Sequence, residues 1–124
     1  MAAEKEITRA VTPEDLGDLL KEPPRAAVAT VRDGRAEAVP VEFRYEAGRY
    51  FVRAAEGLEA GPRAALLIDD GCYHAELRGI SIRGHLAAPG EAPAGLEGFL
   101  EVVPERTSAW HYGAMRKRDD ARPR

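Results

Sequence analysis

The amino-acid sequence predicts a mainly β fold, a small closed barrel or a sandwich of about six strands with one firm helix. Runs of β-prone residues recur along most of the chain, residues typical of tight turns separate them, and one segment has both a helix start and a helix stop. The length of 124 residues corresponds to a single domain. We expect that domain at 12–113, between a flexible N-terminus (1–11) and a charged, disordered tail (114–124).

The first predicted element is a short amphipathic helix. Thr12 can cap it, Pro13 suits its first position, and two acids follow in the first turn. Three leucines at helical spacing share the side expected to lie on the sheet: Leu16, Leu19 and Leu20. The proline pair at 23–24 should end the helix after roughly two turns.

Residues 25–53 predict an antiparallel meander. Asp33-Gly34 and the break at 46–48 separate three β-prone runs with residues that suit tight hairpins. The middle run alternates between an apolar face (Val39, Val41, Phe43 and Tyr45) and a small, polar face (Ala38, Pro40, Glu42 and Arg44). The second face is either a ligand or partner surface or a solvated exterior.

Two further strands are expected after the loop at 54–62. Residues 63–68 form a continuous apolar run typical of a central strand covered on both faces, and a turn at 69–71 ends it. Residues 73–88 predict a long strand with Ile80, Ile82 and Leu86 on one face and Arg83 and His85 on the other. Its internal glycines, at 79 and 84, indicate a bulge, a barrel corner or a close approach of another backbone or a ligand.

The segment Leu96 to Val103 fits both a strand and a helix, since Leu96, Phe99, Leu100 and Val103 also recur at helical spacing. We favour a strand that closes the barrel. The Pro104-Glu105-Arg106 segment is expected to break it.

The amino-acid composition excludes several classes of protein. A net charge of −3 argues against a nucleic-acid binder. One cysteine excludes an internal disulfide, and the absence of a signal peptide or an apolar span predicts a cytoplasmic protein without membrane contact. All but three of the 18 basic residues are arginines, so a bound phosphate would meet a guanidinium. Genomic base composition explains the same bias.

Neither a metal site nor a cysteine nucleophile is predicted. Asp69, Asp70, Cys72 and His74 lie close in sequence, but zinc sites need paired spacings that this group lacks. The acidic neighbours of Cys72 would raise its thiol pKa, which argues against pairing with His74, His85 or His111 for catalysis. The residues therefore assign no catalytic group.

Four segments together resemble the flavin-binding split-barrel superfamily that includes pyridoxamine 5′-phosphate oxidase. They are Pro-Arg-Ala-Ala-Val-Ala-Thr-Val (24–31) after the leucine helix, the meander at 34–52, Pro-Arg-Ala-Ala-Leu-Leu-Ile-Asp (62–69) and Leu-Arg-Gly-Ile-Ser-Ile-Arg-Gly (77–84). The ending at 104–113 is also similar to that of small members. The resemblance covers about residues 12–112 and implies a six-stranded split barrel that dimerises, with FMN, or alternatively a deazaflavin, at the dimer interface. It also implies oxidoreductase activity on an unidentified small molecule.

The resemblance implies cofactor contacts from the second and third strands of the meander and beyond: Val39, Pro40, Val41, Glu42, Arg44, Arg53, Ala54, Arg63 and Trp110, with Tyr112 as an alternative to Trp110. Many members have a basic residue and a serine near the cofactor phosphate, where this chain has Glu56-Gly57-Leu58-Glu59. The two glutamates would repel a phosphate unless Arg53, Arg63 or Arg44 compensates. The second hypothesis is therefore a non-catalytic split barrel that has lost the phosphate site and takes another ligand or no cofactor.

Overall fold

The computed structural model describes residues 12–23, 25–54, 58–71 and 76–111. Predictions made for the N-terminus, the C-terminal tail, Glu56, Cys72, His74 and Tyr112 lie outside these ranges. The fold is mainly β, as predicted. Its seven strands are β1 (Arg25–Arg32), β2 (Arg35–Pro40), β3 (Glu42–Glu46), β4 (Arg49–Arg53), β5 (Arg63–Asp70), β6 (Arg78–Ala87) and β7 (Leu100–His111).

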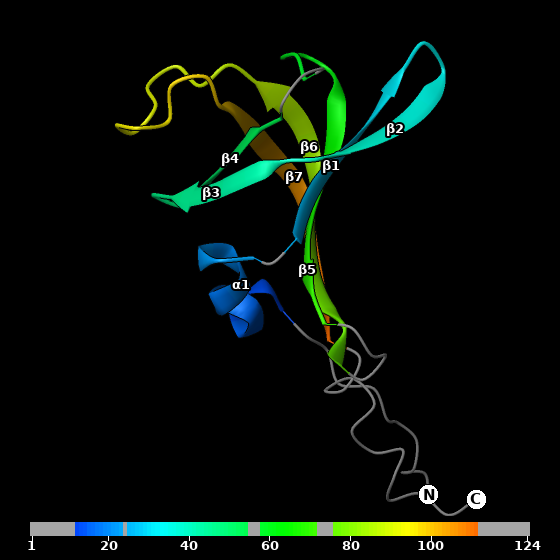
Figure 1. Ribbon diagram of the computed structural model, residues 1–124, viewed down its shortest axis with the longest axis vertical. Helices are drawn as coiled ribbons and strands as arrows, with labels where there is room; N and C mark the ends of the chain where they lie inside the picture. The colour runs from blue at the N-terminus through cyan, green and yellow to red at the C-terminus, as the bar shows by residue number, and fades with distance from the viewer. Residues whose placement is uncertain (1–11, 24, 55–57, 72–75, 112–124) are drawn as a thin grey trace, which may run out of the picture.

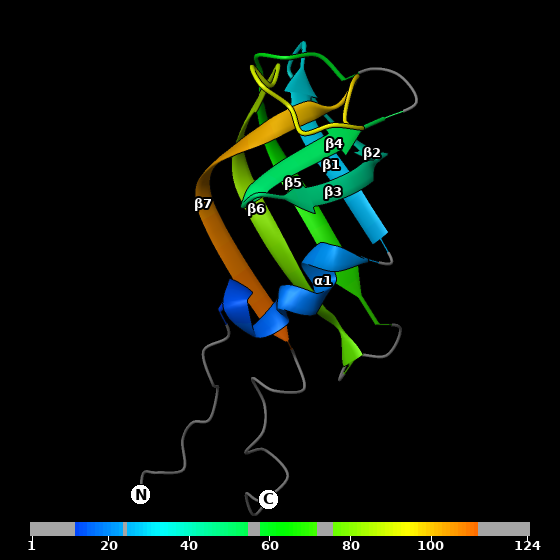
Figure 2. The same cartoon turned by 90° about the vertical axis from the view of Figure 1, so that its left-hand side faces the viewer.

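The strands form one antiparallel sheet in the order β2-β1-β5-β6-β7-β4-β3. The sheet curls into an open half-barrel with β3 and β4 folded over its inner face (Figures 1 and 2). Among the described residues fifteen hydrophobic side chains are buried, and most of them form one cluster on the inner face that includes Val28, Leu66, Ile80 and Val102. The curl therefore gives the sheet a packed inner face and an outer face that remains accessible.

The predicted helix is present as a 3₁₀ turn, η2 (Pro13–Leu16), that continues into α1 (Gly17–Lys21). The Thr12 backbone N–H donates to Asp15 Oδ2 at 2.9 Å and completes a capping box. Leu16 and Leu19 are buried in the main hydrophobic cluster. Figure 2 shows the helical segment that carries them below β3. No helix in the described ranges is long and apolar enough to cross a membrane.

Both predicted hairpins are confirmed. Asp33 and Gly34 have φ of 54° and 75°, and Ala47 and Gly48 have φ of 55° and 75°. Positive φ at both central residues gives the turn type whose twist matches that of the flanking strands. The two short breaks therefore determine the β1–β2 and β3–β4 pairs.

The prediction of six strands is wrong because the middle run of the meander divides at Val41. Its backbone N–H donates to the Ala26 carbonyl oxygen at 3.0 Å, outside the regular ladder. β2 pairs with β1 and β3 pairs with β4, at opposite ends of the strand order. One run thus supplies both edges of the sheet.

The predicted break at Pro104 is also wrong, because β7 passes through it as a bulge. Gly84 pairs with Pro104 and Arg83 with Arg106, which leaves Glu105 as the extra residue. Proline is tolerated at such a position because no ladder donor is needed there. A Cβ at Gly84 would overlap the Val103 carbonyl oxygen, so the predicted close approach at this glycine is confirmed.

The strand favoured from Leu96 begins instead at Leu100. Leu96 and Phe99 are buried with Phe51 in a second cluster on the outer side of β4. Gly95 and Gly98 both have positive φ, which suits turns rather than a strand or helix. The apolar spacing at 96–99 therefore marks a loop that packs through its own side chains.

Candidate ligand-binding site

The outer face of β2, β1 and β5 is small and apolar. Cross-strand register places three rows of side chains on it: Ala36, Ala38 and Pro40 from β2, Ala27, Ala29 and Val31 from β1, and Ala65 and Leu67 from β5. Val31 is 64% exposed and Leu67 is 37% exposed. We call these eight residues the alanine platform. An apolar surface that spans neighbouring strands marks a site for a ligand or partner.

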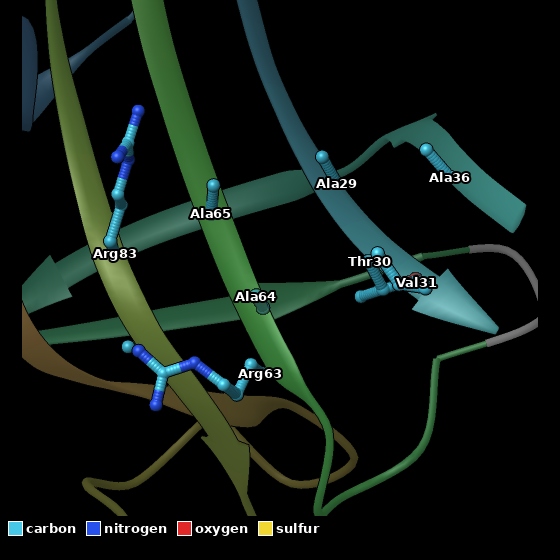
Figure 3. A pocket seen from close by; sticks show the side chains of 9 residues that line it. Ala29, Thr30, Val31, Ala36, Arg63, Ala64, Ala65 and Arg83 are labelled. Carbon is cyan, nitrogen blue, oxygen red and sulfur yellow. The ribbon is translucent and has the colours of Figure 1, made fainter. Parts of the chain in front are cut away.

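A pocket of about 450 Å³ opens on this platform beside β6. Its lining is Ala29, Thr30, Val31, Ala36, Arg63, Ala64, Ala65, Arg83 and Gly84. Figure 3 shows Arg63 and Arg83 on one side and Ala29 and Ala36 on the other, with Ala65 between them. Short alanine side chains leave room for a flat group on the strands, and the guanidiniums can contact an anion at its edge.

One glutamate organises the charges beside the pocket. Glu105 at the β7 bulge accepts a hydrogen bond from Arg63 Nη2 at 2.7 Å, and His85 Nδ1 lies 3.6 Å from its other oxygen. The Arg63 hydrogen bond, assisted by His85, lowers the pKa of Glu105 below its ordinary value. Arg63 is 76% exposed, so an incoming anion can compete with Glu105 for it.

The predicted site residues of the middle run lie on the two edge strands, β2 and β3, or at Val41 between them. Pro40 is exposed on the alanine platform, while Val39 and Val41 are half-buried towards the core. Glu42 and Arg44 are exposed on β3, where Arg44 lies 3.8 Å from Glu46. The predicted alternation holds from Val39 to Arg44, with the bend at Val41 dividing it, but Tyr45 is exposed and does not continue the buried face.

Arg53 and Arg63 do not meet at one site, since β6 and β7 separate their strands in the sheet order. Arg53 Nη2 donates to Glu42 Oε1 at 2.7 Å, and its guanidinium carbon lies 4.6 Å from the centre of the Phe99 ring. Ala54 follows it, half-buried. Of the two arginines, only Arg63 lines the pocket.

Trp110 lies on the outer face near the end of β7, opposite Gly79. A Cβ added at Gly79 would come within 2.5 Å of Trp110 Cζ2, so the indole lies directly over this glycine. The Ile68 carbonyl oxygen would lie 2.9 Å from the same Cβ, so the predicted close approach of another backbone is confirmed, and the indole is an addition to it. Its role as a cofactor contact stays a prediction, because packing on Gly79 explains the same position.

The two aspartates considered for a metal site form ion pairs with arginines. Arg25 Nε donates to Asp69 at 2.8 Å, and Arg78 Nη2 lies 2.9 Å from Asp70 and 2.8 Å from Asp18. Within the described ranges no three potential metal ligands come together. These ion pairs instead attach the helical segment and β1 to β5 and β6.

Sequence reasoning missed most of the pocket. Residues 63–68 were expected to be covered on both faces, but Ala64, Leu66 and Ile68 are buried while Leu67 is exposed. Alanine gives no periodic signal there because it is common on either face. The placement of Arg83 and His85 on one strand face did mark the basic side of the site.

The family model described as pyridoxamine 5′-phosphate oxidase matches residues 12–124. An FAD-binding protein from Mycobacterium smegmatis is 15% identical with a TM-score of 0.66, covering 84% of this chain and 99% of that one. An FAD-binding protein from Mesorhizobium loti is 15% identical with a TM-score of 0.64, covering 83% of this chain and 95% of that one.

A conserved hypothetical protein from Mycobacterium tuberculosis is 17% identical with a TM-score of 0.65, covering 97% of this chain and 94% of that one. At these identities the solved structures show a shared fold. No curated protein matches the chain.

Proposed function

The chain belongs to the pyridoxamine 5′-phosphate oxidase family, and from this membership we propose that it binds a flavin on its outer face as a homodimer. The alanine platform is the observation that carries the proposal. Its short side chains suit a planar ring, and the adjacent arginines suit the negative charge that every flavin nucleotide carries. Two structural neighbours are themselves named as FAD-binding proteins.

FMN is the cofactor we propose, with FAD and a deazaflavin as the competing forms. The bound ring would supply hydride or electron transfer, which makes oxidoreductase activity on a small molecule the matching function. The chain would contribute position and charge: Ala29 and Ala65 lie under the pocket, and Arg63 can turn from Glu105 towards a phosphate. Pro40 borders the same face without a backbone N–H that would need a partner.

The exposure of the alanine platform supports the proposed homodimer. The platform spans three adjacent strands, more than scattered surface hydrophobics would account for. A second copy would cover it through the same surface, as closed two-fold symmetry requires. Ligand sites at the rim of that contact would then be shared by both subunits.

The first test is an absorbance spectrum of the purified protein, followed by titration with FMN, FAD and a deazaflavin. Trp110 is the only tryptophan and lies on the outer face, so its fluorescence should fall in a saturable manner as a flavin binds there. Saturable quenching by one cofactor identifies the preferred form. A colourless protein that responds to none of the three would overturn the flavin proposal.

Arginine variants test the proposed phosphate contact. Arg63→Ala should weaken FMN binding by roughly tenfold, because a charge-assisted hydrogen bond to phosphate is lost. Lys21→Ala removes an exposed charge on α1 and should leave binding unchanged. If Arg53→Ala weakened binding and Arg63→Ala did not, the phosphate would belong beside β4 instead.

A non-catalytic split barrel is the second candidate, and the ion pairs favour it. Both arginines proposed for the phosphate are already bound to glutamates, and Glu59 is exposed in the loop before β5. Such a protein would bind its ligand on the platform without redox chemistry. It would remain colourless and would show no flavin-dependent reduction of an electron acceptor.

The dimer has its own test, which is light scattering after size-exclusion chromatography. Leu67→Glu places a charge on the alanine platform and should shift the protein towards monomer. Tyr45→Glu is the matched control, because Tyr45 is 38% exposed, like Leu67, but lies on β3. Equal masses for the wild type and the Leu67 variant would contradict a dimer through this face.

A further inference from the structure

Two arginines face each other across β6 and β7. Arg83 and Arg106 are direct cross-strand partners, so their Cβ atoms are expected about 5 Å apart on the same face of the sheet. Both side chains are exposed. Like charges in this position destabilise a sheet unless an anion lies between them or near them.

The described part of the chain supplies no such anion. Across residues 12–23, 25–54, 58–71 and 76–111, no side-chain hydrogen bond or ion pair involves Arg83 or Arg106. The nearest acid along β7 is Glu105, which is bound to Arg63 and lies 3.6 Å from His85. Of the basic residues on this part of the outer face, Arg63 and His85 approach the Glu105 carboxylate, and Arg83 and Arg106 do not.

The bulge in β7 fixes this arrangement. Its extra residue is Glu105, and the register on either side of it places Arg106 opposite Arg83. Gly84 sits at the register shift, where any larger residue would overlap the Val103 carbonyl. The backbone register therefore keeps the Cβ atoms of the two arginines opposite each other, so both guanidiniums can reach the same anion.

We propose that Arg83 and Arg106 form an anion subsite that binds the phosphoryl group of a small molecule. Two guanidiniums side by side can donate to several phosphate oxygens at once, which a single ion pair cannot do. Arg83 also lines the pocket on the alanine platform, so an apolar ligand body can lie on Ala29 and Ala65. The subsite stands apart from the flavin proposal, because it needs only the phosphoryl group.

Pyrophosphate is the probe, used with the full-length protein without added flavin. Thermal unfolding and isothermal titration calorimetry are measured in pyrophosphate and in sodium chloride of matched ionic strength. The wild type should gain several degrees from pyrophosphate beyond the chloride value. No gain beyond chloride would overturn the subsite.

Single substitutions test which side chains bind the pyrophosphate. Arg83→Gln and Arg106→Gln should each weaken pyrophosphate binding at least about tenfold, and should raise the melting temperature without anion because the like-charge contact is removed. Lys21→Gln is the control for net charge. Glu105→Gln should strengthen binding several-fold, since Arg63 is then free to act as a third donor. An equal loss in the Lys21 variant would reduce the effect to general charge attraction and overturn the proposal.

The phosphoryl group has two possible sources, and competition separates them. If it belongs to the flavin, FMN and pyrophosphate will compete for Arg83 and Arg106. If it belongs to a separate substrate, both will bind together and each will retain its affinity. Both results support the subsite, while failure of FMN to bind leaves the pyrophosphate result unaffected.

A second copy of the chain is the remaining occupant to exclude. Carboxylates of a partner subunit could neutralise the arginine pair at a dimer contact. In that case Arg83→Gln would shift the mass towards monomer and leave the pyrophosphate response unchanged. That combination would overturn the proposal.

Discussion

Two groups of arginines on this molecule differ in the contacts that their side chains make with acidic and aromatic residues. Beside β4, Arg49 makes a bidentate contact with Glu101 at 2.8 and 3.1 Å, donates to the Glu91 carbonyl at 2.9 Å and lies over the Phe51 ring. Arg53 likewise has Glu42 and the Phe99 ring.

Across β5, β6 and β7, by contrast, the described acids provide Glu105 for Arg63 and nothing for Arg83 or Arg106. An arginine whose side chain has no acidic partner within the fold is therefore the one that indicates a binding role. The β4 group attaches a loop to the sheet, and loss of those contacts should reduce stability. The outer-face group contributes little to the fold, so its positive charge is available for binding.

The largest expected effect lies in the β4 region. Phe99→Ala should lower the free energy of unfolding by about 3–5 kcal/mol, because a buried ring that packs on Phe51 and supports Arg53 is lost. Urea denaturation measures this change. The pyrophosphate response of the outer face should survive in the folded variant, and a cost below about 1 kcal/mol would show that the cluster is poorly packed.

Gly84→Ala should reduce both the stability of the fold and the binding of pyrophosphate. The added methyl overlaps the Val103 carbonyl, so the bulge must shift at a cost of about 1–3 kcal/mol. Because the bulge sets the register of Arg83 and Arg106, the pyrophosphate response should fall as well. Chemical denaturation and calorimetry on one sample check both changes; lost stability with full pyrophosphate binding would separate the bulge from the subsite.

Glu101→Gln should produce a smaller loss, a few degrees in melting temperature. It leaves Arg49 without its bidentate partner, in a region where both side chains are partly covered. The loss should persist at about 1 M sodium chloride, whereas any effect of Glu105→Gln on stability should disappear there, since exposed charges are screened more strongly. Equal salt sensitivity of the two variants would remove the distinction between the regions.

The smallest effect is the pH dependence of the Arg63–Glu105 pair. The folded pKa of Glu105 lies below its ordinary value of 4.5, chiefly because of the Arg63 hydrogen bond. The pair therefore stabilises the fold above that value and ceases to do so as the pH falls through the lowered pKa. Melting curves from neutral to acidic pH should show a slightly shallower decline for Arg63→Ala than for wild type.

Arg78 lowers the pKa values of Asp18 and Asp70 in the same acidic window, and both proteins share that decline. Only the difference between the two curves reports on Glu105. Superimposable curves would show that the pair makes no contribution.

The sequence predicted the turns and the helix start correctly, because these features depend on a few neighbouring residues. Asp33-Gly34 and Ala47-Gly48 specified their turns, and Thr12 with Pro13 specified the helix start. The bend at Val41 was not predictable, because it depends on which strands the two halves pair with.

Contacts between distant residues explain what the site prediction lacked. Glu42 accepts a hydrogen bond from Arg53, and Glu105 accepts one from Arg63, which lies 42 positions away in the sequence. Arg83 meets Arg106 only through a bulge whose existence depends on the packing of two strands. Proline at 104 indicated an interruption, but a bulge and a strand end look the same in sequence.

The bend at Val41 also bears on how this protein behaves at high concentration. Because β2 and β3 are the outermost strands of the described sheet, their outward backbone groups are where another chain could add a strand and start a fibril. Both strands are short, Pro40 removes a donor from one, and Glu42, Arg44 and Glu46 charge the other. Growth by edge addition is thereby disfavoured, and concentrated solutions should stay clear of amyloid.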